Sequence, residues 1–260
     1  MQIIGHRGGL AENGAVENTV EQMRRGVELG LTAVEFDLRT TRDGFVVVNH
    51  DPWLLCDKTV LIARTNLQDL KKRTRRAGYD IATLDEMLAA LAKMKTNDGA
   101  PIKLDIEFKR LSAIRPALKI LKKHLKSLNR TSRPPIVFSS FWPLQLLRLK
   151  RLAPQVPRAL LLVQVPILPR FYPLKLAKKL FKIKAVGVAD KFFWPGLARR
   201  AKKSGLKFYV YTAGRKADDG RKFLRAAARQ GLAAAIVNSP SRVLKWQKAD
   251  ADLRRPGEIV

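Results

Sequence analysis

The sequence predicts an α/β fold, a closed (β/α)8 TIM barrel with a short added strand and a small excursion after the second strand. Short aliphatic or β-branched runs alternate with amphipathic stretches along the chain, which is the pattern of a parallel sheet. Eight such units fit into about 250 residues without a separating linker, which favours a closed barrel. The first strand is not followed by GxGxxG, which argues against an open dinucleotide-binding sheet.

Each expected strand is a short apolar run bounded by polar or turn residues. We expect the barrel strands at residues 2–4, 33–38, 102–107, 136–139, 159–164, 185–188, 207–212 and 234–238, and the added strand at 45–49. A polar, basic excursion over residues 52–79 follows the added strand.

The expected helices carry apolar residues at spacings of three and four. The clearest runs from Leu111 to Leu128 and has lysines on its other face. Asn18 or Thr19 is suited to cap the first helix. We expect helices at 20–29, 83–95, 111–128, 142–152, 174–181, 196–204, 220–230 and 241–247. Residues 1–248 then form a single domain, and residues 249–260 a loose C-terminal tail.

The composition excludes several classes of protein. A single cysteine, Cys56, excludes a disulfide framework and a cysteine-based zinc site. The longest apolar run is about half of the ~20 residues that a membrane span needs. The first residues, MQIIGHRGG, lack the features of a secretory signal. We therefore expect a cytoplasmic protein.

The net charge of +29 is unevenly distributed. Sixteen of the 22 acidic residues lie at or before Glu107, whereas Phe108 to Lys207 holds 25 basic residues and one acid, Asp190. Such a surface attracts polyanions, for example nucleic acid, anionic lipid headgroups or phosphorylated substrates. An equally weighted alternative is that the charge only keeps the protein soluble.

The ends of the first strands carry the residues suited to chemistry. Active sites of such barrels lie at the carboxyl ends of the strands. Alternation places Glu35 and Asp37 on one side of their strand, and Asp105, Glu107 and Lys109 on one side of theirs. Converging carboxylates suit a divalent cation, Mg²⁺ or Ca²⁺ rather than zinc. The alternative is that these acids pair with lysines and arginines.

Two histidines fall at the same ends. His6 and His50 suit general acid–base work, because imidazole titrates near neutrality. Arg7 and Lys109 add positive charge suited to a phosphate. His124 lies on a lysine-rich helix face, and we expect no catalytic role for it.

These motifs resemble the glycerophosphodiester phosphodiesterase family over residues 1–109. A single triplet is a weak signal, but the ordered set is strong. The later half matches mainly in its rhythm of strands and helices. The matching pieces are His6-Arg7-Gly8, Glu17-Asn18-Thr19, Glu35-x-Asp37, Thr41-x-Asp43-Gly44, His50-Asp51, Thr83-Leu84-x-Glu86 and Ile106-Glu107-x-Lys109.

The resemblance implies a barrel enzyme that hydrolyses glycerophosphodiesters to glycerol 3-phosphate and an alcohol. It implies a divalent metal held by Glu35, Asp37 and Glu107. It implies that His6 and His50 are the acid–base pair and that the phosphodiester is bound by the residues Arg7 and Lys109. The implied route is attack by the substrate's glycerol 2-hydroxyl, followed by hydrolysis of the cyclic phosphate. Which histidine is the acid stays open.

Three positions depart from the family pattern. Val16 replaces the proline usual before Glu-Asn-Thr. Gly214 stands where an asparagine is usual, and Asn238 where an aspartate is usual. We expect the last change to alter the far side of the pocket, and substrate identity more than catalysis.

Apolar residues follow several strands on the expected catalytic side. Together with the basic surface, they suggest a lysophospholipid substrate or action at an anionic membrane surface. The alternative, of equal weight, is that they pack into small cores at the helix tops. They are Trp53, Leu54, Leu55, Phe141, Trp142, the run from Val165 to Leu174, Phe192, Phe193 and Trp194.

Two other functions compete with this interpretation. A sphingomyelinase D-like phospholipase shares the barrel, the histidines and the acidic ligands, but those toxins are secreted and disulfide-bonded. A non-catalytic polyanion-binding barrel has no need of His6, His50 or the three acids. No nucleic-acid-reading motif is visible, so we expect no specific nucleic acid partner. The sequence leaves the oligomeric state and the choice between Mg²⁺ and Ca²⁺ open.

Overall fold

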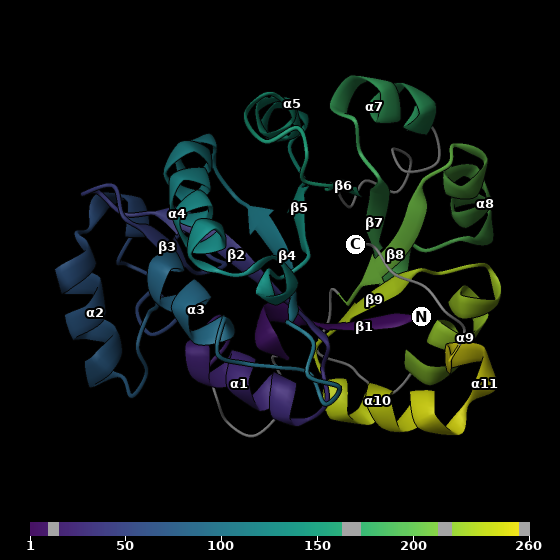
Figure 1. The fold of residues 1–260 in the computed structure, drawn as a ribbon, viewed down its shortest axis with the longest axis horizontal. Coiled ribbons are helices and arrows are strands. Elements are labelled where there is room, and N and C mark those ends of the chain that lie inside the picture. Colours follow the sequence, from purple (N-terminus) through teal and green to yellow (C-terminus); the bar gives the residue numbers. More distant parts are fainter. Residues whose placement is uncertain (10–15, 163–172, 213–219, 255–260) are drawn as a thin grey trace.

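Eight parallel strands close into a barrel, as the sequence predicts (Figure 1). The computed structural model describes residues 1–9, 16–162, 173–212 and 220–254. Each strand pairs with the next along the chain, and the pair Gly5–Val34 joins the first strand to the second. The barrel strands are β1 (Gln2–Gly5), β2 (Ala33–Thr40), β4 (Lys103–Phe108), β5 (Ile136–Ser140), β6 (Arg158–Leu162), β7 (Ala185–Ala189), β8 (Lys207–Tyr211) and β9 (Ala234–Val237).

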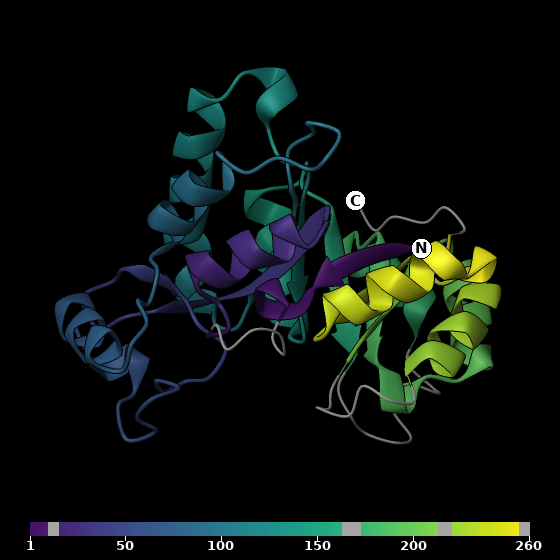
Figure 2. The same cartoon turned by 90° about the horizontal axis from the view of Figure 1, so that it is seen from below.

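Helices surround the barrel on its outside, and α10 and α11 lie beside β1 in both views (Figures 1 and 2). Gln247 on α10 donates a hydrogen bond of 2.6 Å to the carbonyl of Met1, which ties these helices to the first strand. The helices are α1 (Val20–Glu28), α2 (Leu67–Arg76), α3 (Leu84–Leu91), α4 (Ile114–Ser127), α5 (Pro143–Leu152), α7 (Leu174–Phe181), α8 (Pro195–Lys203), α9 (Gly220–Arg229), α10 (Pro240–Ala249) and α11 (Ala251–Arg254). None of the described helices is both long and apolar enough to cross a bilayer.

The strands alternate between two environments, as a period of two requires. On β2, Val34, Phe36 and Leu38 face the helices and join the main core, whereas Glu35 and Asp37 lie on the opposite side. The interior of the barrel holds a second apolar cluster, and the buried carboxylates of Glu35 and Asp37 are not part of it. This cluster consists of Ile4, Ala33, Val137, Ala159, Leu161, Ala185, Tyr209, Ala234 and Ile236.

The added strand β3 (Val46–Val48) pairs antiparallel with the end of β2, outside the barrel. The excursion behind it is better ordered than its polar sequence suggests. It contains α2, which the sequence analysis did not predict because this helix carries few apolar residues. A small core of its own holds the excursion together, formed by Val47, Leu54, Val60, Ile62, Leu70 and Ile81.

Several expected boundaries move for physical reasons. The helix expected from residue 111 begins at Ile114, because Pro116 lacks an N–H and is tolerated only in the first turn. Thr19, not Asn18, caps α1, and its hydroxyl accepts the amide of Gln22. The tail expected to be loose after residue 248 instead continues into α11, where Leu253 is fully buried.

Candidate active site

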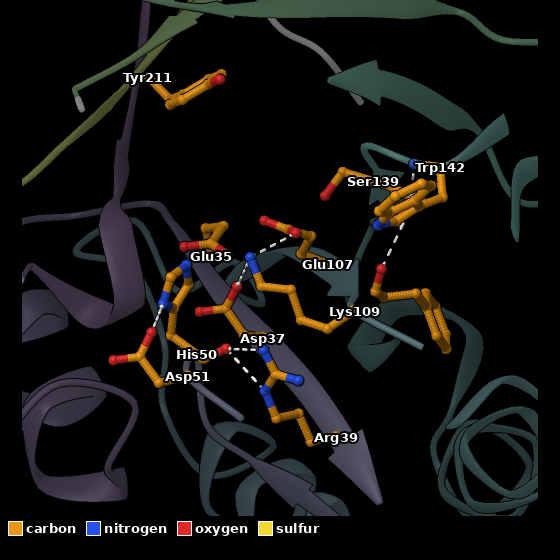
Figure 3. A network of polar contacts seen from close by, with 12 residues as sticks. Glu35, Asp37, Arg39, His50, Asp51, Glu107, Lys109, Ser139, Trp142 and Tyr211 are labelled. Atoms are coloured by element: carbon orange, nitrogen blue, oxygen red, sulfur yellow. Dashed lines mark hydrogen bonds and ion pairs between the residues drawn. The ribbon is translucent and has the colours of Figure 1, made fainter. Parts of the chain in front are cut away.

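The expected site residues meet at the carboxyl ends of the first barrel strands. β2 carries Glu35 and Asp37, and β4 carries Glu107 directly beside Asp37 in the strand register. All three carboxylates are buried, and one oxygen from each lies within 4.8 Å of the others. Figure 3 shows them gathered around the end of the Lys109 side chain.

Like charges and burial act together on these carboxylates. Burial, followed by repulsion from Asp37 and Glu107, raises the pKa of Glu35 well above its usual range. Burial raises the pKa of Glu107 to about 7, although Lys109 opposes it. Oε1 of Glu35 is buried and has no hydrogen-bond partner. The cluster therefore holds more negative charge than its own cation compensates.

Lys109 is the cation within the cluster. Its Nζ lies 2.9 Å from Oδ1 of Asp37 and 2.6 Å from Oε1 of Glu107. Burial alone would lower the pKa of Lys109, but the neighbouring carboxylates of Asp37 and Glu107 raise it above its ordinary value. Burial also pushes the pKa of Asp37 upwards, but Lys109, His50 and Arg7 hold it well below its usual range. The alternative, in which the acids pair with lysines and arginines, thus holds for Asp37 and Glu107 but leaves Oε1 of Glu35 without a hydrogen-bond partner.

Arg7 enters the site through a strained turn. It has a φ of 53°, in the left-handed region, and leads into Gly8 and Gly9, which also have positive φ. This turn directs the Arg7 amide to Oε2 of Glu35, at 2.9 Å. The guanidinium lies 2.8 Å from Glu17 and 3.6 Å from Asp37.

His6 begins the same turn. Its Nδ1 lies 2.6 Å from Oδ1 of Asn238, behind β9, and its Nε2 lies 3.9 Å from Oε2 of Glu35. Burial and the neighbouring Arg7 lower the pKa of His6 to about 3, against the opposing effect of Asn238. The imidazole is therefore neutral at pH 7, and an N–H at Nδ1 leaves the Nε2 lone pair free.

His50 lies on the other side of the carboxylates and has a charged partner. Its Nδ1 lies 2.8 Å from Oδ1 of Asp51, and its carbonyl accepts a 2.8 Å hydrogen bond from Nε of Arg39 (Figure 3). Burial, with the cations Lys109 and Arg7, lowers the pKa of His50 to about 4, although Asp37 and Asp51 oppose this. His50 is more exposed than His6.

Sequence reasoning missed several residues of the site. Asn18 donates to Oδ2 of Asp37 at 3.0 Å and accepts a hydrogen bond from the backbone amide of Asp37, so it holds both the carboxylate and the main chain of that residue. Beneath the cluster, Ser139 donates to Asp105 at 2.6 Å, and burial raises the pKa of Asp105 to about 7. The motif Glu17-Asn18-Thr19 offered a signal for Asn18, whereas Ser139 offered none.

The structure shows where some of the positions that differ from the family pattern lie, and where some of the apolar residues expected on the catalytic side lie. The Asn238 side chain contacts His6 directly, so the expectation that this change concerns the far side of the pocket was wrong. Gly214 and the run 165–172 lie outside the described residues. Phe193 packs against Phe208 and Phe223, whereas Trp142 is 63% exposed.

Comparison with known proteins identifies the family of this chain. The model of the glycerophosphoryl diester phosphodiesterase family matches residues 6–240. A glycerophosphodiester phosphodiesterase of Caldanaerobacter subterraneus subsp. tengcongensis is 26% identical over 256 residues, which cover 93% of this chain and 96% of that protein. A probable glycerophosphodiester phosphodiesterase 2 of Mycobacterium tuberculosis is 31% identical over 108 residues, 41% of this chain and 38% of that protein.

Solved structures share the fold. The structure of an Oleispira antarctica phosphodiesterase in complex with the product sn-glycerol-3-phosphate has a TM-score of 0.78 and 22% identity, and covers 95% of this chain and 97% of that one. A putative glycerophosphodiester phosphodiesterase from Galdieria sulphuraria has a TM-score of 0.77 and 21% identity, and the match covers 95% of this chain and 97% of that one. The match over nearly the whole chain, together with the barrel, shows that this chain belongs to the glycerophosphoryl diester phosphodiesterase family of hydrolases.

Proposed function

We propose that this chain hydrolyses glycerophosphodiesters to glycerol 3-phosphate and an alcohol, with His6, His50, Glu35, Asp37, Glu107, Arg7 and Lys109 as its site. One observation carries the proposal. Two imidazoles, two cations and three buried carboxylates meet at the mouth of one barrel. A barrel that only bound polyanions would gain nothing from buried carboxylates, because they repel the ligand.

The three carboxylates fit a divalent cation. They offer only oxygen ligands, which suit Mg²⁺ or Ca²⁺, and Oε1 of Glu35 is buried without a partner. Glu35, Asp37 and Glu107 would hold the ion. When bound, it supplies positive charge that polarises a phosphoryl oxygen and lowers the pKa of a neighbouring hydroxyl.

Arg7 and Lys109 would bind the phosphodiester. Both side chains are largely buried and stay charged, since carboxylates raise the pKa of each against the effect of burial. A buried cation attracts a phosphate oxygen more strongly than a solvated one, because the local dielectric is low. These two residues therefore orient the phosphorus relative to the histidines.

The partners of the two histidines suggest separate roles. His6 has a neutral amide at Nδ1, which orients the ring and leaves Nε2 free to accept a proton. His50 has the carboxylate of Asp51 at Nδ1, which stabilises a protonated imidazole. We therefore assign the general base to His6 and the general acid to His50.

Under this assignment, Nε2 of His6 removes the proton of the glycerol 2-hydroxyl, whose oxygen attacks phosphorus. His50 enters this step as the imidazolium, because the negative charge of the bound phosphodiester adds to that of Asp51 and favours the protonated ring. The bond from phosphorus to the alcohol oxygen breaks, and His50 gives its proton to that oxygen. Water then opens the five-membered cyclic phosphate with the two proton transfers reversed, which yields glycerol 3-phosphate. Both steps conserve protons between the two imidazoles.

A lysophospholipid is a second candidate substrate. Its support is the aromatic ring of Phe141, whose centroid lies 5.6 Å from Nζ of Lys109, followed by the exposed indole of Trp142. An acyl chain that extends from the bound phosphate would meet these apolar groups first. Action at an anionic membrane surface belongs to the same proposal.

The test measures glycerol 3-phosphate released from glycerophosphocholine and lysophosphatidic acid released from lysophosphatidylcholine, with Mg²⁺, Ca²⁺ or EDTA. We expect turnover that EDTA abolishes, and Mg²⁺ or Ca²⁺ to raise the melting temperature of the wild type but not of Glu107→Gln. A matched control is Glu86→Gln, in the exposed capping box at the start of α3. Turnover in EDTA at the full rate overturns the metal, and no turnover of either substrate overturns the proposed activity.

A further inference from the structure

Exposed apolar side chains concentrate on two neighbouring helices. Of the eleven large apolar side chains exposed in the described part of the chain, six lie on or directly before α5 and on α7. Leu144 is 61% exposed and Leu176 is 51% exposed. We name this surface the α5–α7 face, and it consists of Trp142, Leu144, Leu147, Leu152, Leu176 and Leu180.

The two helices form one surface because they are bonded to each other. Nζ of Lys150 on α5 donates to the carbonyl of Leu180 on α7 at 2.9 Å. Figure 1 shows α5 and α7 next to each other on the outside of the barrel. On α7, Leu176 and Leu180 are four residues apart and thus lie on the same side of the helix.

Basic residues flank the leucines and no acid balances them. Lys175 and Lys179 repeat with the same spacing of four beside Leu176 and Leu180, and Arg151 lies in the last turn of α5. The sequence contains no acidic residue from Phe108 to Ala189. The α5–α7 face therefore combines apolar contact area with an uncompensated positive charge.

The neighbouring surface continues the same pattern. A groove of about 590 Å³ lies between α4 and the end of α5, and the apolar residues that line it include Leu118, Leu125 and Val156. Basic residues line it as well, namely Arg115, Lys119, Lys122, Lys126 and Arg133. The positive field thus extends well beyond the leucines themselves.

We propose that the α5–α7 face docks this protein on an anionic lipid bilayer. Leucines and a tryptophan would enter the boundary between headgroups and acyl chains, and the flanking lysines would contact the anionic headgroups. A second copy of the chain is disfavoured as the occupant, because each copy carries a charge of +29. An acidic protein would also form ion pairs with the lysines. Parallel rows of leucine and lysine along one helix, however, are typical of a helix that lies at a membrane surface.

The position of Trp142 connects this face to the site. Its amide donates to Oγ of Ser140, at the carboxyl end of β5, 3.1 Å away. Trp142 therefore connects the start of α5 to the mouth of the barrel, and Figure 3 shows it beside Ser139. The inference extends the proposed function, on which it rests for the lipid origin of the substrate.

The experiment measures co-sedimentation with vesicles of phosphatidylcholine alone and with 30–40% phosphatidylglycerol, roughly the anionic fraction that gives a strong surface potential. We expect binding to the anionic vesicles, and at least a tenfold weaker partition for the variant Leu144→Glu/Leu176→Glu/Leu180→Glu. All three side chains are exposed, so the fold tolerates the change. The matched control Leu29→Glu/Phe45→Glu changes exposed apolar residues elsewhere and is expected to bind like the wild type.

Intrinsic fluorescence gives a second readout. Trp142 is the exposed member of four tryptophans, so brominated lipids should quench emission in the wild type and much less in Trp142→Phe.

No binding to anionic vesicles at low salt overturns the proposal. Equal binding by the leucine variant and the wild type also overturns it, since attraction would then be electrostatic only. Turnover of soluble glycerophosphocholine is measured in parallel: its absence contradicts the proposed function, while the vesicle result decides the docking face separately.

Discussion

The interior of the barrel differs between its two halves. On the first side, β2 and β4 turn Glu35, Asp37, Asp105 and Glu107 inwards, where each is buried. On the other side, β6 to β9 turn three alanines, Leu161, Ile236 and Tyr209 inwards, and these form most of an apolar cluster. All seven candidate site residues thus come from residues 1–109, whereas the later strands supply a rigid wall.

This difference separates two uses of charge within one chain. The first half buries acids at a cost in desolvation, which suits a site that holds cations. The second half exposes basic residues to water, where each affects stability little but all together shape the surrounding field. The overall charge of +29 therefore describes the outside of the barrel and not its site.

The strongest way to test the comparison is to remove a histidine from the first half. His6→Ala and His50→Ala are each expected to lower kcat/KM for glycerophosphocholine by about 10²–10⁴-fold, the usual contribution of a general acid or base. His124→Ala is the matched control, since His124 pairs with Asp85 on the helix surface. Circular dichroism checks folding, and a loss below tenfold in both site variants would contradict their roles.

A second prediction concerns the buried acid beneath the cluster. The pKa of Asp105 is about 7 in the folded chain against an ordinary 3.8, so the folded state binds more protons between these values. The contribution of Asp105 to the free energy of unfolding must then fall as pH rises from about 4 to about 7. Asp105→Asn cannot ionise and escapes this loss.

We therefore expect the stability of Asp105→Asn relative to the wild type to increase by roughly 1.4 kcal/mol per pH unit over that window, and to level off above pH 7. Urea unfolding in EDTA at pH 5, 6, 7 and 8 measures the difference. Asp98→Asn, at an exposed turn, is the control. A difference independent of pH would show that Asp105 is ionised in the folded chain.

Asn238, in the second half of the chain, is hydrogen-bonded to a candidate catalytic histidine. Asn238→Ala removes the acceptor at Nδ1 of His6, so kcat is expected to fall about tenfold while KM changes little, the effect of one lost hydrogen bond to the base. Asn238→Asp keeps an acceptor and should recover most of kcat. Asn129→Ala, at an exposed position, is the control. A change confined to KM would instead assign Asn238 to substrate binding.

The smallest effect is expected from the surface charge. Lys119→Gln/Lys122→Gln/Lys126→Gln changes exposed residues of α4, so turnover of glycerophosphocholine should stay within twofold and stability within about 0.5 kcal/mol. Steady-state kinetics and thermal unfolding measure both. A large loss of turnover would mean that the basic surface serves the site after all.

The sequence allowed the barrel, its strand order and the family to be predicted because strand alternation and the motifs are local. Glu35 and Asp37 lie on one strand, so a period of two already places them together. The contact between His6 and Asn238 joins residues 232 positions apart and depends on closure of the barrel. The insertion of Lys109 between Asp37 and Glu107 depends on packing in three dimensions in the same way.

Elements without a clear apolar period were also beyond the sequence. Helix α2 exposes most of its length and buries only Leu70 and Thr74, so composition alone suggested a loop. Helix α11 has four residues and is stabilised by one buried side chain, Leu253. In both cases the order comes from tertiary contacts, which a single sequence does not display.

The junction of β1 and β2 has a consequence for how variants of Glu35 are interpreted. Backbone pairing across it is limited to Gly5 and Val34, whereas β1 pairs with β9 at four positions. Past this pair, the backbone amide of Arg7 donates to Oε2 of Glu35. A side-chain oxygen of β2 thus takes the place of a main-chain carbonyl between the two strands. A substitution at Glu35 therefore opens the barrel wall as well as removing a charge, and faster hydrogen exchange at the Arg7 amide would separate the mechanical loss from the chemical one.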